Sequence, residues 1–362
     1  MDDADREFDE LAALTGALLG ALEALALIGR RLNPPDLPEL LAAVGAPEAA
    51  LSEHLQQASG WQGPVAALRG PLEAAGQAVI SAFEGLRAGV AAGDVMQSFK
   101  ALRHGPLALE ALYPLAGLLP PVSRFFLEPA VRGDTELQAR FNAPAPHTGV
   151  MYGGGEPGAH GAFSVYVPEY YSPDRAWPLV VALHGGSGNG RAFLWSWLRA
   201  ARSHGAIVVA PTAIGQTWAL TGPDLDTPNL AHVLSEVGAR WTLDRQRLLL
   251  TGMSDGGTFS YVSGLEPASP FTHLAPVAAA FHPMLAQTAE PERLRGLPIH
   301  VAHGALDWMF PVDMAFQAVG ALEAAGAEVV YREIDDLAHT YPGELNPEIL
   351  AWLDATPRPA RG

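Results

Sequence analysis

The sequence predicts an α/β protein with a mostly parallel central sheet, preceded by an all-α helical domain. Before residue 148 there is no strand-like alternation, and leucines recur at helical spacing. After it, short continuous apolar runs alternate with helical stretches, which is typical of strands that are covered on both faces. The segment 142–146, which two prolines stiffen, separates the helical part of the chain from the part with alternating strands and helices. We therefore expect a helical domain over 1–143 and an α/β domain over 147–362.

Composition narrows the classes of function. The 362 residues suffice for two domains, and the formal net charge of −17 argues against nucleic acid or an anionic membrane surface as a partner. The absence of cysteine excludes disulfides, thiolate metal sites and cysteine nucleophiles. The N-terminus, Met1-Asp2-Asp3-Ala4-Asp5, is acidic where a signal peptide needs basic residues. We therefore expect a cytoplasmic protein.

The first half of the chain reads as a set of helices. Residues 3–32 carry leucines spaced by three, four or seven, which is the pattern of one apolar helix face. Between Leu11 and Ile28 only Glu23 is charged, so a membrane span is the alternative to a bundle helix. Glu23 near the middle, the diluting Ala and Gly residues and the acidic flank favour the bundle helix, and no stable span is expected. Tandem prolines end this helix, and further helices are expected at 36–55, 70–91 and 94–118.

The second half reads as a sheet with intervening helices. Two apolar segments, 150–152 and 163–167, flank a glycine-rich loop and predict an antiparallel hairpin. Further strands are expected at 179–183, 206–210, 248–250, 275–281, 299–302 and 329–334, with helices at 230–240, 256–264, 312–325 and 347–354.

A serine stands at the apex of one predicted turn. The segment Gly252-Met253-Ser254-Asp255-Gly256 follows the apolar run 248–250 and precedes a stretch that can be helical. This Gly-x-Ser-x-Gly pattern is typical of a strand, a strained tight turn and a helix, with the serine hydroxyl clear of the backbone. The two glycines allow strand and helix to pass closely, because they lack Cβ atoms.

Two more polar residues follow predicted strands. Asp307 comes after the strand at 299–302, and His339 after the strand at 329–334. Ligands bind beyond the carboxyl ends of strands in such sheets. Ser254, Asp307 and His339 are the trio that ester cleavage needs, since an imidazole must take the serine proton and a carboxylate must orient that imidazole. An isolated aspartate can instead cap a helix, and an isolated histidine can lie on the surface.

The strand at 179–183 ends in a glycine-rich turn, 184–190. Its backbone N–H groups, together with the N–H of Asp255, can stabilise a developing oxyanion. A phosphate-binding loop is the alternative, but the Gly-Lys-Ser/Thr ending is missing. We interpret Ser187 as a turn residue rather than a second nucleophile, and His184 as a support of the turn rather than a base.

These motifs together resemble an α/β-hydrolase over residues 148–362. The details are similar to the branch that holds carboxylesterases, feruloyl esterases and polyhydroxyalkanoate depolymerases. The resemblance implies Ser254 as nucleophile, Asp307 as acid and His339 as base, with the N–H groups of Gly186 and Asp255 as the oxyanion hole. The matching segments are 183–190, 243–247, 252–257, 303–307 and 339–343.

Four residues are candidates for contact with substrate: Trp218, Ser187, Trp308 and Tyr341. Trp218 lies where relatives often place an aromatic residue beside the pocket, and a plain packed tryptophan is the alternative.

The resulting hypothesis is a serine carboxylesterase that acts on a small-molecule ester without a metal or organic cofactor. A thioesterase or peptidase with the same triad is one alternative, and a non-catalytic interaction protein on a hydrolase fold is another. The helical residues 1–143 are not part of the family pattern. They can act as a lid, as a surface for homo-oligomerisation or as a scaffold.

Overall fold

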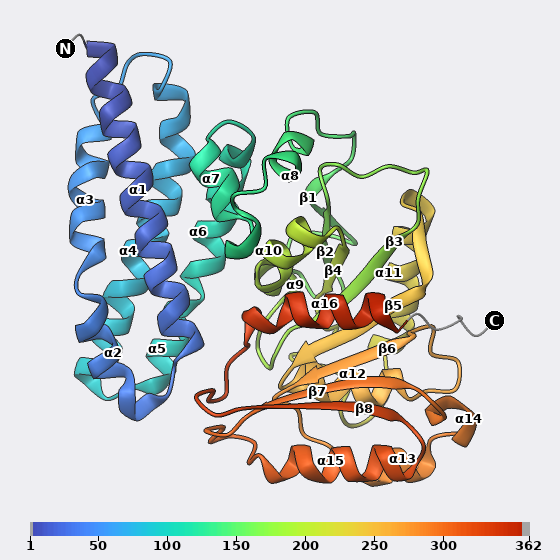
Figure 1. Ribbon diagram of the computed structural model, residues 1–362. Helices are drawn as coiled ribbons and strands as arrows, with labels where there is room; N and C mark the ends of the chain where they lie inside the picture. Colours follow the sequence, from blue (N-terminus) through green and yellow to red (C-terminus); the bar gives the residue numbers. More distant parts are fainter. Residues whose placement is uncertain (1–2, 357–362) are drawn as a thin grey trace. The chain divides into compact units, whose positions relative to one another are not determined.

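The computed structural model describes residues 3–356 (Figure 1). The chain divides into two compact units, Met1–Asp134 and Thr135–Gly362. This division precedes the boundary expected between residues 143 and 147.

The segment that leads into and includes the prolines at 144 and 146 belongs to the second unit through its own contacts. It contains the short helix α8 (Thr135–Arg140). The guanidinium of Arg202 lies 3.7 Å from the ring centre of Phe141, and the N–H of Ala145 donates to the carbonyl of Glu169 over 2.8 Å. These contacts tie the linker to the sheet domain, which composition alone did not indicate.

The described part of the first unit is built from helices, of which α1 and α4 are the longest. Buried leucines of the α1 stripe, among them Leu14, Leu18 and Leu25, form part of its core. Over Asp5–Arg30, α1 is long and apolar enough to cross a membrane, a test that the core helix of a soluble protein also passes. The helices are α1 (Asp3–Arg30), α2 (Leu37–Val44), α3 (Pro47–Ala58), α4 (Ala66–Ala92), α5 (Val95–Leu102), α6 (His104–Leu112) and α7 (Pro120–Phe125), with short 3₁₀ turns η1 (Pro34–Asp36), η2 (Tyr113–Gly117) and η3 (Pro129–Val131).

Two of the long helices expected here are broken. The one predicted at 36–55 divides into α2 and α3, because Gly45 takes a positive φ of 71° and Pro47 starts a new helix. The one predicted at 94–118 divides into α5, α6 and η2. Residue composition therefore predicted continuous helix across positions where the backbone turns.

The second unit contains an eight-stranded sheet in the order β1-β2-β4-β3-β5-β6-β7-β8. β2 pairs antiparallel with both β1 and β4, and the remaining pairs are parallel. The predicted hairpin and the predicted parallel sheet are thus confirmed. The strands are β1 (Gly149–Gly153), β2 (Phe163–Val167), β3 (Trp177–Leu183), β4 (Ile207–Pro211), β5 (Leu243–Met253), β6 (His273–Val277), β7 (Pro298–Gly304) and β8 (Glu328–Ile334).

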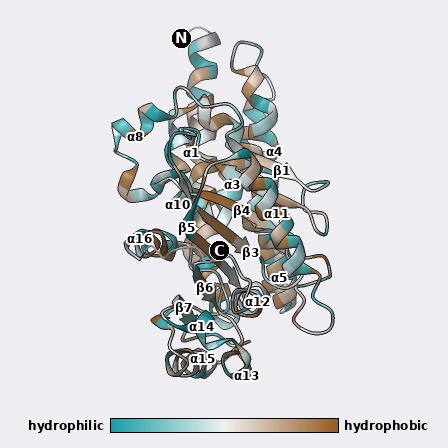
Figure 2. Cartoon of the chain, turned by 90° about the vertical axis from the view of Figure 1, so that its right-hand side faces the viewer, coloured by the Kyte–Doolittle hydropathy of each residue, from teal (hydrophilic) through white to brown (hydrophobic). Residues whose placement is uncertain are grey.

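Helices lie on both faces of this sheet (Figures 1 and 2). The central strands β3 and β4 are strongly hydrophobic in Figure 2, as expected for strands covered on both faces. Helices α10 and α16 are joined by a hydrogen bond of 2.7 Å from Asn346 Nδ2 to the carbonyl of Ser196. Besides α8, the helices are α9 (Gly190–Phe193), α10 (Trp195–His204), α11 (Asp226–Arg240), α12 (Asp255–Gly264), α13 (Met284–Thr288), α14 (Pro291–Leu294), α15 (Asp313–Ala324) and α16 (Asn346–Ala355), with the 3₁₀ turn η4 (Gly343–Leu345).

One expected strand ends early. The strand predicted at 275–281 stops at Val277, because Ala278 adopts a positive φ of 47° and turns the chain. Helices α9 and α10 fill the stretch after the glycine-rich turn, where no element was expected. The parallel strands β3, β5, β7 and β8 all end at one edge of the sheet, and each is followed by one of the predicted site segments.

Candidate active site

Ser254 lies between the end of β5 and the start of α12, with φ 57° and ψ −119°. Such a conformation is strained for a residue with a side chain. A Cβ at Gly252 would lie 2.5 Å from the carbonyl carbon of Gly256, and a Cβ at Gly256 would collide with the carbonyl oxygen of Leu183. The strand, tight turn and helix expected from the sequence are present, and both glycines are needed for the close approach.

Three side chains from different strand ends meet at this serine. His339 Nε2 lies 3.0 Å from Ser254 Oγ, and His339 Nδ1 lies 2.8 Å from Asp307 Oδ2. A carboxylate can only accept, so Nδ1–H donates to Asp307 and the neutral ring offers Nε2 to the serine hydroxyl. All three residues are buried, between 6% and 8% exposed. This geometry allows the imidazole to take the hydroxyl proton.

The carboxylate of Asp307 is held by its own turn. Its Oδ1 accepts the N–H groups of Met309 (2.9 Å) and Phe310 (2.8 Å), which leaves Oδ2 for His339. The Phe310 ring meets the His339 imidazole edge-on, with ring centres 5.2 Å apart. Phe310 therefore contacts both the acid and the base. Its position three residues after Asp307 carries no motif, so the sequence does not mark Phe310 as a site residue.

The glycine-rich turn after β3 runs beside the serine. A Cβ at Gly185 would lie 3.6 Å from the Cβ of Ser254, and a Cβ at Gly186 would lie 2.8 Å from Asp255 Oδ2. Within residues 3–356, the N–H groups of Gly186 and Asp255 donate to no protein acceptor. Asp255 is also the first residue of α12, where the helix dipole favours negative charge.

His184 supports this turn, as its position in the sequence indicated. Its Nε2 accepts the N–H of Ala213 (3.1 Å), so the ring proton is on Nδ1 and is donated to the carbonyl of Gly185 (2.7 Å). Burial lowers the pKa of His184 below its usual value. A neutral ring with both nitrogens bonded to the backbone is unavailable as a base.

Two of the four substrate-contact candidates have polar atoms bonded within the protein. Trp218 is buried, its Nε1–H donates to the carbonyl of His184 (2.8 Å), and its ring stacks on Phe259. These contacts are those of the packed tryptophan that was the alternative interpretation. The Tyr341 hydroxyl donates to Asn346 Oδ1 (2.8 Å), and burial raises the pKa of Tyr341 well above its usual value.

The other two candidates are on turns at the same edge. Ser187 is exposed and has a positive φ of 57°, in a turn closed by a 3.0 Å bond from the N–H of Gly188 to the carbonyl of Gly185. Trp308 is 46% exposed and directly follows Asp307. A role of these residues in substrate binding stays a prediction.

The loop between β4 and α11 is fixed by a carboxylate that the sequence analysis missed. Asp226 is buried, and its two oxygens accept the N–H groups of Ile214 and Ala219, each over 2.8 Å. Between these anchors, Thr217 Oγ1 donates to Asp255 Oδ2 over 2.5 Å. The only sequence signal for Asp226 is its place at the start of a helix, which predicts a cap and not a loop clamp.

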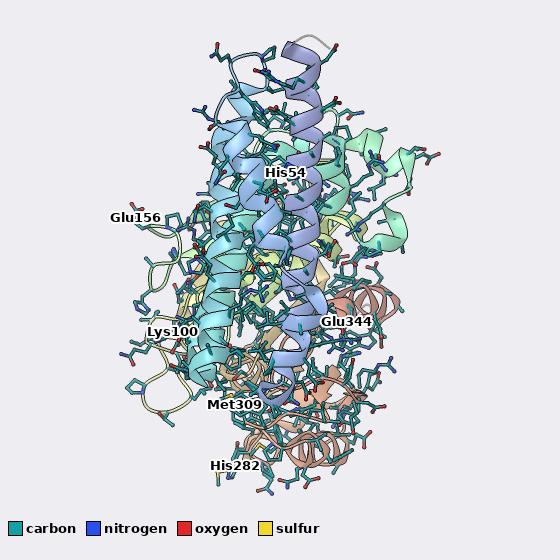
Figure 3. The ribbon with its side chains drawn as sticks, turned by 90° about the vertical axis from the view of Figure 1, so that its left-hand side faces the viewer. His54, Lys100, Glu156, His282, Met309 and Glu344 are labelled. Atoms are coloured by element: carbon teal, nitrogen blue, oxygen red, sulfur yellow. The ribbon has the colours of Figure 1, made fainter. Side chains whose placement is uncertain are left out.

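No group of three histidine or acidic side chains in residues 3–356 has a geometry that could hold a metal ion. His54, labelled in Figure 3, lies in α3 and contacts Gln57 of the same helix. His282 and Met309, also labelled there, come from the segments after β6 and β7.

Comparison with known proteins finds esterases. No family model matches the chain. It is 30% identical over 159 residues to a bifunctional acetylxylan esterase/xylanase of Neocallimastix patriciarum, which covers 42% of this chain and 22% of that protein. It is 28% identical over 154 residues to a "Probable feruloyl esterase C" of Aspergillus terreus, which covers 41% of this chain and 55% of the relative. The match therefore spans about half or less of each curated relative.

Solved structures with a similar chain path include a thermostable esterase and a ferulic acid esterase. The first has 24% identity and a TM-score of 0.44, and covers 54% of this chain and 59% of its own. The second has 16% identity and a TM-score of 0.49, and covers 58% of this chain and 100% of its own. The sheet order and the serine at the strand–helix turn fit an α/β-hydrolase, and the sequence similarity is to curated esterases.

Proposed function

We propose that the chain is a serine hydrolase that cleaves carboxylic esters through an acyl-enzyme. The observation that carries the proposal is the 3.0 Å between Ser254 Oγ and His339 Nε2, with Asp307 on the other ring nitrogen. An alcohol is a weak nucleophile at neutral pH, so a base in this position is what the chemistry requires. The curated esterase relatives support an ester as the substrate.

In the first step, Ser254 Oγ attacks the ester carbonyl carbon while its proton passes to His339 Nε2. The Asp307 carboxylate stabilises the imidazolium through the Nδ1–H bond. His339 then gives the proton to the leaving alcohol oxygen, and the acyl group stays on Ser254. In the second step, water loses a proton to His339 and attacks the acyl carbon. The bond from that carbon to Ser254 Oγ then breaks, His339 Nε2 returns the proton to Oγ, and the carboxylic acid leaves.

We assign to the N–H groups of Gly186 and Asp255 the stabilisation of the negative charge that develops on the carbonyl oxygen. Support comes from their position beside Ser254 and from the absence of any protein acceptor for them in the described chain. The start of α12 adds a favourable dipole at Asp255. Hydrogen-bond donors that already point at the oxyanion position lower the activation barrier, because they do not have to reorient during the reaction.

We also propose that the helices before Asp134 form a domain of their own. Support comes from side chains of α1 and α4 that are fully buried, including Leu14, Leu18, Val79 and Phe83. We therefore expect this part of the chain to fold when it is expressed without the hydrolase.

The test uses a fluorophosphonate probe and p-nitrophenyl acetate on the full chain. We expect the probe to label Ser254, and Ser254→Ala to lose labelling and nearly all turnover while its thermal melt is unchanged. Ser196→Ala is the matched control, because that hydroxyl only bonds the carbonyl of Phe193 in the preceding turn. Most activity persisting in Ser254→Ala would reject the proposal, and a wild-type chain that is never labelled would indicate a non-catalytic protein. A panel of ester, thioester and peptide substrates separates the hydrolase classes.

A further inference from the structure

A second histidine lies beside the acid–base pair and takes no part in the proton transfers above. His303 is the sixth residue of β7 and is 1% exposed. Its Nε2 lies 2.8 Å from the carbonyl oxygen of Phe310 and 3.4 Å from Asp307 Oδ2. A carbonyl only accepts, so Nε2 carries the proton and donates it to Phe310.

That carbonyl belongs to the turn that carries the acid. The N–H of Phe310 donates to Asp307 Oδ1, and the Phe310 ring packs edge-on against His339. A bond that fixes the Phe310 peptide therefore acts on both the carboxylate and the imidazole. His303 supplies this bond from a buried strand, which is a more rigid support than the turn itself.

The start of the same turn is fixed separately. The N–H of Leu306 donates to the carbonyl of Leu337 over 3.0 Å, two residues before His339. The N–H of Asp307 donates to the carbonyl of Gly304 over 3.2 Å. These backbone bonds hold residues 304–307, whereas the far end of the turn, at Phe310, is held by the His303 side chain.

We infer that His303 is a positioning residue for the acid–base pair: it holds Phe310, and through Phe310 it sets the places of Asp307 and His339. The inference rests on the proposed function of the triad. A misplacement of about 1 Å in a catalytic group can lower a rate by about 100-fold. Loss of the donor also leaves the carbonyl of the half-buried Phe310 without its partner.

The test compares two substitutions by kcat and KM for p-nitrophenyl acetate on the full chain. His303→Gln keeps an N–H donor near the position of Nε2, and His303→Leu removes it. We expect kcat to fall about 10- to 100-fold in the leucine variant with KM within about 2-fold, and to stay within about 5-fold of wild type in the glutamine variant. A folded leucine variant with wild-type kcat, or a glutamine variant as slow as the leucine variant, would overturn the inference.

His273→Leu is the matched control for general loss of stability. His273 is also a buried strand histidine with hydrogen bonds, but it starts the neighbouring strand β6 and bonds Thr356, far along the strand from Ser254. This variant should lower the melting temperature and leave kcat of the folded enzyme unchanged. If His303→Leu does not fold, His303→Asn replaces it in the comparison. The shorter asparagine amide does not reach the carbonyl of Phe310, so we expect this variant to show the same fall in kcat as expected for His303→Leu.

A double-mutant cycle with Asp307→Asn separates positioning from generic damage. If His303 acts through Asp307, adding His303→Leu to Asp307→Asn should slow kcat by less than about 3-fold, because the interaction it supports is already lost. Independent, multiplicative losses would overturn the part of the inference in which His303 positions Asp307. Ser254→Ala is measured in parallel: activity that survives this change rejects the proposed function itself, whereas Ser254-dependent activity with an inert His303 rejects only the inference.

Discussion

The hydroxyl of Thr217 donates to the carboxylate of Asp255 over 2.5 Å and so joins the loop after β4 to the first residue of α12. Asp255 is also the residue whose N–H we assign to the oxyanion hole. The loop is clamped on both sides of Thr217, at Ile214 and Ala219, by the buried carboxylate of Asp226. A fixed loop therefore holds the side chain of the residue whose N–H we propose as an oxyanion donor.

We expect Thr217→Val to lower kcat by about 3- to 30-fold with little change in KM, because the Asp255 side chain loses the donor that fixes it. Stability should fall by about 1 kcal/mol, the usual net contribution of one hydrogen bond. Steady-state kinetics and a thermal melt measure both effects. Thr227→Val is the control, since the buried Thr227 hydroxyl has no hydrogen-bond partner in the described chain. Equal kinetic losses in the two variants would contradict the expectation.

Asp307→Asn should lower kcat by about 10³- to 10⁴-fold and leave the fold intact. The neutral amide cannot stabilise the imidazolium and favours the wrong tautomer of His339. The kinetic measurement is made alongside Asp335→Asn and Asp336→Asn, which precede His339 in the same segment. A larger loss in either of these would mean that Asp307 is not the acid.

The parts of the site that sequence predicted depend on local chain geometry. Ser254 was recognisable because Gly252 and Gly256 are needed within a five-residue turn. Asp307 and His339 were recognisable because each follows the end of a predicted strand by five residues. The bonds of Thr217 and His303 were not predictable, because they depend on where a loop returns in space.

Errors in the predicted elements have the same origin. Nothing in the apolar run after residue 275 marks Ala278 as a residue of positive φ, yet its N–H leaves the strand to donate to the carbonyl of Ala302. Gly45 marks a helix break in the sequence itself. The helix-favouring residues on both sides nevertheless led to the prediction of one continuous helix. Composition predicted the class of element well and its ends poorly.

Trp308→Ala should raise KM for aryl esters by about 3- to 10-fold with a smaller effect on kcat. The residue directly follows Asp307 and is 46% exposed, and the prediction takes its ring to contact a substrate bound at Ser254. KM values for p-nitrophenyl esters measure the effect. Phe316→Ala is the control, because Phe316 is similarly exposed but lies on α15. The same change in KM for both variants would remove Trp308 from the substrate-contact candidates.

His300 links stability to pH in the second unit. It is buried in β7 against Trp352, and neither ring nitrogen has a hydrogen-bond partner in the described residues. Burial lowers the pKa of His300 below its usual value, and Arg332 acts in the same direction, whereas Glu348, 3.7 Å away, opposes the shift. The folded state therefore favours the neutral ring.

The free energy of unfolding should consequently fall as pH drops below about 6.5, because the unfolded chain then binds the proton more readily than the folded chain. His300→Leu removes this titration, and no charge has to be buried at low pH. We expect its urea midpoint to change less than that of wild type between pH 7.5 and pH 5. His232→Leu, at an exposed position of α11, should keep the wild-type slope. A His300→Leu slope equal to wild type would show that other groups dominate the acid sensitivity.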